Sequence, residues 1–266
     1  MDSLDEFIKI LWDDYAGLNK QAGEIFTLLT GRGEQVFNDH IAFRTFDLPK
    51  VGVAKLAQHF ERFGYEAKGE YEFKEKKLHA KHYEHPGGDK PLVFISELKT
   101  AAFSSRLQDI VKGLVDQVPN ERVDAPDFPV SGRLWKDTSY ADYEQLKTES
   151  EYAAWLSVFG FRPNHFTVQF NALKGFKDFQ EFNRFLIDSG FKMNTSGGLI
   201  KGTAADLLEQ SSTLAHPVEV AFADKKMTVP ACYYEFARRY PDARGKLFTG
   251  FIAQSADKIF ESTDNK

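Results

Sequence analysis

Cysteine is almost absent from this sequence of 266 residues, in which Cys232 is the single copy. An intramolecular disulfide framework is therefore excluded, and a reducing compartment such as the cytoplasm is expected. No apolar run approaches the roughly 20 residues that a membrane-spanning helix needs. The first residues are acidic and lack the basic and apolar regions of a signal peptide. These absences predict a cytoplasmic protein without a membrane partner.

An excess of positive charge is also missing. The chain has 34 lysines and arginines against 39 aspartates and glutamates, which gives a net charge of -5. Nothing in this balance favours a nucleic-acid partner, although a local basic pocket is compatible with it. The sequence contains no glycine-rich dinucleotide loop, no phosphate-binding loop and no Gly-x-Ser-x-Gly nucleophile turn. Several common classes of enzyme chemistry are therefore disfavoured.

What the sequence does contain is an internal repeat. The stretches 38–46 (NDHIAFRTF) and 161–170 (FRPNHFTVQF) each place a histidine at the start of an alternating, strand-like run. Each run leads through a loop into an amphipathic helix that ends at a glycine followed by an aromatic residue. Because 24 positions separate His40 from Gly64 and 25 separate His165 from Gly190, the copies keep register over a strand and a helix.

The repeat predicts an α+β protein of two β-α-β-β-β units in a single domain. In the first unit, a Pro-Gly-Gly-Asp turn joins two alternating runs into a hairpin. In the second, hairpin signals lie at 194–198 and 215–222, and the last strand falls within 229–236. The predicted segments are N-terminal helices (1–33) packed on the outer face of the first repeat, the first repeat (38–98), a helical insertion (99–160), the second repeat (161–240) and a C-terminal segment (241–266) with a frayed polar tail after Phe260.

Two histidines on the predicted first strands and one glutamate on a predicted last strand form a candidate metal site. His40 and His165 occupy the same place in the two copies, and Glu235 lies on the last strand of the second copy. Two histidines and one carboxylate are the facial ligand set of non-haem Fe(II) oxygenases, which leaves positions open for substrate and dioxygen. These ligands leave a ferrous centre at net +1, which suits an anionic 2-oxo acid.

Each ligand also has a structural interpretation. A single strand histidine is more often structural than metal-bound, and only its duplication favours the metal. Glu235 could instead pair with an arginine at 238 or 239, as exposed carboxylates commonly do. Glu97 competes for the ligand role, because it holds the place on the last strand of the first repeat that Glu235 holds in the second. These alternatives stay open at the level of sequence.

Residues near the candidate ligands have two interpretations each. Strand alternation places Arg44 on the face of His40 and Gln169 on the face of His165. Arg44 is either a forked carboxylate anchor or a surface ion-pair residue. Gln169 either positions a substrate oxygen or is structural. His82 alone could line the pocket, because strand alternation keeps it from converging with His79 and His85.

The set resembles a known family. Asn38-Asp39-His40-Ile41-Ala42-Phe43-Arg44, Pro163-Asn164-His165 and Tyr233-Tyr234-Glu235 resemble the 2-oxoadipate dioxygenase/decarboxylases, whose paired modules form a half-barrel of the vicinal oxygen chelate type. The resemblance implies that His40, His165 and Glu235 bind Fe(II) and that Arg44 holds a substrate carboxylate. It further implies conversion of 2-oxoadipate and O2 into 2-hydroxyglutarate and carbon dioxide, in lysine catabolism.

Two other functions fit the same expected fold. A glyoxalase-like lyase or isomerase would use a divalent metal as a Lewis acid without consuming dioxygen, and a fourth ligand such as Glu97 would favour it. A metal-free binding module would have no use for the trio of His40, His165 and Glu235. The oligomeric state, the preferred length of the acid and the carboxylate that Arg44 holds are left undetermined by the sequence.

Overall fold

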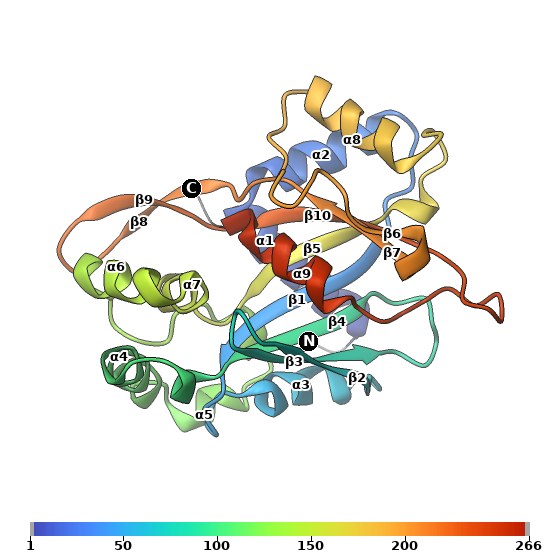
Figure 1. Ribbon diagram of the computed structural model, residues 1–266. Helices are drawn as coiled ribbons and strands as arrows, with labels where there is room; N and C mark the ends of the chain where they lie inside the picture. The colour runs from blue at the N-terminus through green and yellow to red at the C-terminus, as the bar shows by residue number, and fades with distance from the viewer. Residues whose placement is uncertain (1–2, 264–266) are drawn as a thin grey trace.

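A curled sheet of eight strands organises the protein, in the order β2-β3-β4-β1-β5-β10-β7-β6 (Figure 1). The computed structural model describes residues 3–263. The strands of the sheet are β1 (Asn38–Phe46), β2 (Glu66–Phe73), β3 (Leu78–Glu84), β4 (Leu92–Leu98), β5 (Pro163–Gln169), β6 (Lys201–Thr203), β7 (Leu208–Ser212) and β10 (Tyr233–Arg239). The main helices are α1 (Leu4–Leu18), α2 (Lys20–Gly31), α3 (Val53–Glu61), α4 (Ser105–Asp116), α5 (Asn120–Val123), α6 (Tyr140–Glu149), α7 (Glu151–Phe159), α8 (Phe179–Asp188) and α9 (Ala253–Phe260).

The two predicted repeats are confirmed as β1-α3-β2-β3-β4 and β5-α8-β6-β7-β10. In each, the first strand pairs in parallel with the last, β1 with β4 and β5 with β10. The antiparallel pairing of β1 with β5 joins the two halves at the centre of the sheet. Gly64 and Gly190, just after α3 and α8, have φ values of 92° and 93°, a left-handed conformation that glycine adopts without strain. The two repeats therefore share the same order of elements and the same glycine conformation at the end of the helix.

The stretch 215–222 enters a hairpin, as its signals predicted, but this hairpin is not part of the sheet of the second repeat. The stretch 217–221 forms β8 (Pro217–Ala221), which pairs only with β9 (Lys226–Pro230) in a separate two-stranded ribbon. This ribbon lies against α6, where the ring of Phe222 meets that of Tyr140 edge-on at 5.2 Å (Figure 1). The places corresponding to β2 and β3 are filled by the short strands β6 and β7.

Helices α1 and α2 form the predicted N-terminal helical segment, but their packing differs in part from the expectation. The Ser3 hydroxyl caps α1 by accepting a hydrogen bond from the Glu6 amide. Phe7 does reach the first repeat, where its ring lies 5.3 Å from that of Phe60. The remaining aromatic residues of α1 pack on the second repeat, with Trp12 edge-on to Phe166 at 5.2 Å. The N-terminal helices thus cover the outer face across both halves.

The insertion folds into helices as predicted, and these helices are α4 to α7. Helices α6 and α7 are separate, because Ser150 leaves the helical conformation between them and its side chain caps α7. Helix α7 packs against the end of β1, where the Tyr152 hydroxyl accepts a hydrogen bond from the Thr45 amide and donates one to the Ser96 carbonyl. This helix closes one end of the half-barrel.

The C-terminal segment covers the open side of the curled sheet. Helix α9 crosses in front of β1 and β5, and it contacts β2 at one edge and β6 and β7 near the other (Figure 1). The tail expected to fray after Phe260 instead forms a short 3-10 turn in which Ser262 and Thr263 are buried. That part of the expectation was wrong, and residues 264–266 lie outside the described chain. No helix within residues 3–263 is both long and apolar enough to cross a membrane.

Candidate metal centre

The structure brings His40, His165 and Glu235 together on the concave face of the sheet. The Nε2 atoms of the two histidines are 3.4 Å apart, and they lie 3.6 Å and 3.1 Å from the Glu235 oxygens Oε1 and Oε2, respectively. Donors held about 2.1 Å from a six-coordinate ion and adjacent to one another are roughly 3 Å apart. The spacing of the donor atoms therefore fits one ion bound on one face, and all three side chains are buried.

Neighbouring residues orient both imidazoles. His40 donates from Nδ1 to the carboxylate of Asp39 at 2.8 Å, and His165 donates from Nδ1 to the amide oxygen of Asn164 at 3.1 Å. These bonds leave each Nε2 unprotonated and directed at the same point, where the Thr167 hydroxyl also lies 3.1 Å from the Nε2 atom of His40. A metal-binding histidine is commonly fixed by such an acceptor on its other nitrogen. In both copies, the polar residue directly before the histidine thus orients the imidazole ring.

The electrostatics of the trio favour the ligating forms. Burial lowers the pKa of His165, although the charge of Glu235 opposes this effect, and a lowered pKa keeps the imidazole neutral. Burial alone would raise the pKa of Glu235, but His40 and His165 hold it below its usual value. A neutral imidazole and an ionised carboxylate are the forms that bind a metal ion.

Asp39 links the candidate ligands to the C-terminal segment. Arg239 forms a bidentate pair with this carboxylate, from Nε at 2.7 Å and from Nη2 at 2.8 Å. Its remaining nitrogen, Nη1, donates to the carbonyls of Phe248 and Gly250 at 3.0 Å and 2.8 Å. Burial would raise the pKa of Asp39, but Arg239 and His40 hold it well below its usual range, so this carboxylate stays ionised.

Replacing Asp39 by asparagine is expected to weaken metal binding by about 10- to 100-fold, the usual cost of losing the acceptor behind a metal-binding histidine. The substitution keeps the shape of the side chain but removes the charge that faces His40 and Arg239. The measurement is competition for Fe(II) with a chelator under anaerobic conditions. Asp13→Asn, at an exposed position of α1, is the matched control. Equal affinities in the two variants would refute a supporting role for Asp39.

Arg44 is buried beside the trio, and the surface ion-pair interpretation of this residue was wrong. Its side chain is about 1% exposed and stacks near Tyr152 and Trp155 of α7. It donates to Glu151 at 3.4 Å and to Thr263 at 3.3 Å. Its Nε atom and the Tyr233 hydroxyl are both buried without a hydrogen-bond partner among the described residues. Unpaired buried donors next to a candidate centre are suited to a polar ligand.

Two further predicted residues lie on the concave face. Gln169 stands at the end of β5, in register with Ala237 of β10. His82 is buried in the first repeat, where its Nδ1 lies 2.8 Å from the Tyr71 hydroxyl and its ring lies 5.5 Å from that of Phe251. His79 is on the opposite face, so no cluster forms with His82, as strand alternation predicted. The ligand-binding roles of Gln169 and His82 stay predictions.

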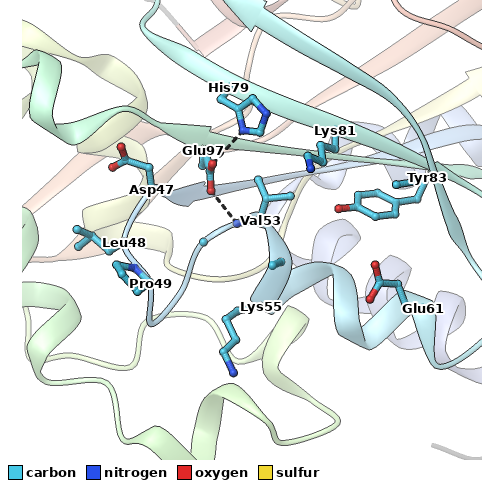
Figure 2. A pocket seen from close by; sticks show the side chains of 13 residues that line it. Asp47, Leu48, Pro49, Val53, Lys55, Glu61, His79, Lys81, Tyr83 and Glu97 are labelled. Carbon is cyan, nitrogen blue, oxygen red and sulfur yellow. Dashed lines mark hydrogen bonds and ion pairs between the residues drawn. The ribbon is translucent and has the colours of Figure 1, made fainter.

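Glu97 does not compete with Glu235. It pairs in register with Thr45 and points to the outer face, where its carboxylate accepts hydrogen bonds from His79 and from the Val53 amide at the start of α3, at 2.9 Å and 2.8 Å (Figure 2). The hollow beside it, of about 430 Å³, therefore lies away from the trio. The residue that corresponds to Glu235 in the first repeat is Phe94, since each lies opposite the residue two positions after the repeat's histidine.

Sequence reasoning also missed a supporting residue. Gln210 of β7 donates from Nε2 to Glu235 at 2.6 Å and is buried. The strand that carries it has polar residues at most positions and gives no clear hydrophobic alternation. The arginines offered as partners of Glu235 pair elsewhere, Arg239 with Asp39 and Arg238 with Glu209. Cys232 is buried in the hydrophobic core, and burial raises the pKa of its thiol to about 12.

Paired β-α-β-β-β modules around a central two-histidine, one-carboxylate set define a protein of the vicinal oxygen chelate class. Comparison with known proteins is more specific. The family model described as 2-oxoadipate dioxygenase/decarboxylase matches residues 10–125 and 130–246. The chain belongs to this family.

Three relatives illustrate the similarity. The 2-oxoadipate dioxygenase/decarboxylase of Oryza sativa, named as a chloroplast and amyloplast protein, is 36% identical over 94% of this chain and 76% of its own length. The crystal structure of hydroxyglutarate synthase from Oryza sativa in complex with 2-oxoadipate is 34% identical, with a TM-score of 0.91 over 99% of this chain and 95% of that one. A Shewanella frigidimarina protein, provisionally named a hydrolase, is 47% identical, with a TM-score of 0.91 over 95% and 99%.

Proposed function

We propose that the protein is an Fe(II)-dependent dioxygenase that converts 2-oxoadipate and O2 into 2-hydroxyglutarate and carbon dioxide. The observation that carries the proposal is the convergence of His40, His165 and Glu235 beside the buried guanidinium of Arg44. This combination offers a facial metal site and a carboxylate anchor in one interior. The names of the relatives supply the substrate and the product class.

The donor set supports iron as the metal. Two imidazole nitrogens and one carboxylate oxygen on one face are the ligands that non-haem Fe(II) oxygenases use. Bound there, Fe(II) would supply the site where a 2-oxo acid chelates and where dioxygen is activated. The protein's own contribution is to hold the three donors in place through Asp39, Asn164 and Gln210.

The residues around the trio would orient the substrate and exclude water. The fork of Arg44 would hold a substrate carboxylate, as a guanidinium does in a bidentate pair. Helix α9 and the ring of Phe251, which meets the His40 ring edge-on at 4.8 Å, cover the centre. Gln169 and His82 would complete the polar lining. An enclosed site suits chemistry in which a reactive oxidant must meet one carbon only.

The reaction balances with dioxygen as the only oxidant. One oxygen atom enters the new carboxylate that forms when the 2-oxo acid loses carbon dioxide, and the other becomes the new hydroxyl group. No external 2-oxo acid is required, because the substrate carries its own. The family resemblance places this reaction in lysine catabolism, and the cytoplasm stays the predicted compartment.

The test is dioxygen consumption by anaerobically Fe(II)-loaded protein after 2-oxoadipate is added. Uptake of one O2 for each carbon dioxide released is expected, and 18O2 should place one labelled atom in the hydroxyl group and one in a carboxylate. Metal binding without uptake, with every 2-oxo dicarboxylate tried, would refute the oxygenase. The lyase or isomerase would then be favoured, although Glu97, the fourth ligand that it would use, lies on the outer face.

A further inference from the structure

Two rows of side chains cross the concave face of the sheet through the candidate ligands. The first row begins at His40 of β1, which lies opposite Thr167 of β5, and Thr167 in turn lies opposite Glu235 of β10. The second row consists, in the same way, of His165 of β5, Ala42 of β1 and Phe94 of β4. Residues directly opposite one another point to the same face of a sheet. Phe94 therefore stands to His165 as Glu235 stands to His40.

The side of the centre that Phe94 occupies is apolar. Phe94 is about 4% exposed, and its ring lies 4.7 Å from the ring of Phe251, which meets the His40 ring edge-on at 4.8 Å. His82 is opposite Phe94 on β3, and its Nδ1 atom lies 2.8 Å from the Tyr71 hydroxyl. Ring carbon atoms therefore line this side, and the Nδ1 atom of the neighbouring histidine is already hydrogen-bonded.

The side of the centre that belongs to the first row is polar. The Thr167 hydroxyl lies 3.1 Å from the Nε2 atom of His40, and Gln210 donates to Glu235 at 2.6 Å. The two molecules that the centre would receive differ in the same way. A 2-oxo acid is anionic and needs polar partners where it leaves water, whereas dioxygen is small, uncharged and apolar. The polar side therefore suits the acid, and the apolar side suits dioxygen.

We propose that Phe94 leaves the coordination position on its side without a protein donor and that dioxygen reaches the centre there, while the 2-oxo acid chelates on the side of Thr167. This inference rests on the proposed function, because it assumes that iron and a 2-oxo acid bind at the trio. If Phe94 only filled the core, a carboxylate in its place would change stability without changing which of the two molecules binds.

The test introduces a carboxylate at this position. In Phe94→Glu, the new side chain should reach the ion beside His165 as Glu235 does beside His40, and become a fourth protein ligand. Nitric oxide serves as the probe for dioxygen, because it binds ferrous iron and gives an electron paramagnetic resonance signal. Chelation of 2-oxoadipate is followed by the visible absorption of ferrous 2-oxo acid complexes. Both are measured anaerobically on Fe(II)-loaded protein.

The wild type is expected to show the 2-oxoadipate absorption and, once nitric oxide is added, the resonance signal. Phe94→Glu should retain iron and the absorption, because a six-coordinate ion with four protein ligands still has room for a chelating acid. Its affinity for nitric oxide should fall by at least roughly 10-fold, since a carboxylate held beside the ion competes for the same position. Phe94→Leu, which keeps the apolar character, should bind both molecules as the wild type does.

Phe37→Glu controls for the added carboxylate, because Phe37 is 53% exposed. Thermal unfolding checks that each variant is folded, and Phe94→His, which adds a neutral donor of similar shape, replaces the glutamate variant if that one is not. A folded donor variant that loses iron, loses the 2-oxoadipate absorption or binds nitric oxide as the wild type does would overturn the inference. A wild type that chelates the acid without binding nitric oxide would do the same. Failure of the wild type to bind iron or 2-oxoadipate would instead overturn the proposed function.

Discussion

Replacing His165 by alanine is expected to abolish metal binding, and with it all dioxygen consumption in the presence of 2-oxoadipate. The variant loses one of three donor atoms whose Nε2 and carboxylate oxygens lie 3.1 to 3.6 Å apart. Loss of a direct ligand should weaken affinity by more than the roughly 100-fold that follows the loss of a supporting acceptor. Iron content after desalting and oxygen uptake are measured on the same sample.

His216→Ala is the matched control, since His216 stands at the start of the β8–β9 ribbon, outside the concave face. It should retain both iron and activity. A His165→Ala protein that holds one equivalent of iron as tightly as the wild type would remove His165 from the ligand set. A protein that binds iron weakly yet turns over at saturating Fe(II) would show that two ligands suffice.

Replacing Arg44 by methionine is expected to separate metal binding from catalysis. Iron should still bind, because Arg44 is not one of the three donors. Removing one partner of a buried, charge-paired contact costs about 2 to 5 kcal/mol, so kcat/KM with 2-oxoadipate should fall by roughly 30- to 5000-fold. Steady-state oxygen uptake at several substrate concentrations gives this ratio.

Arg44→Lys makes the same experiment more specific. Lysine keeps the positive charge but loses the planar fork, so an intermediate loss is expected if two parallel hydrogen bonds hold the carboxylate. Equal kcat/KM for the lysine variant and the wild type would mean that charge alone is needed. An unchanged kcat/KM in the methionine variant would contradict the anchoring role altogether.

The sequence allowed the repeat to be predicted because each copy carries its own local signals. A histidine opens each first strand, and a glycine with a positive φ ends each helix. The prediction that Glu97 and Glu235 hold equivalent places in the two repeats was wrong for a different reason. It relied on position near the end of a strand, whereas pairing register decides which face a side chain occupies, and an odd offset reverses the face. Glu97 pairs with Thr45 on the helix-covered side.

The second half of the centre was harder to predict because its strands line a polar interior. Strand β7 sends Gln210 and Ser212 inward, so it lacks the apolar alternation by which strands are usually recognised. The exposed stretch 217–221 has a clearer pattern and was mistaken for a strand of the sheet. Arg239 binds the C-terminal segment through the backbone carbonyls at 248 and 250. A contact with backbone atoms does not depend on the side chains there, so the pattern of side chains in the sequence could not predict it.

The two halves differ at the position of the candidate carboxylate ligand, where the first repeat has Phe94 and the second has Glu235. Two identical modules related by a twofold axis would present every residue of their interface twice, so a glutamate would face its own copy across the metal. Fusion in one chain removes that constraint. One half can then contribute a histidine and an arginine, and the other a histidine and a carboxylate. Such an interior can distinguish the two ends of an asymmetric molecule, which a strictly symmetric pair cannot do.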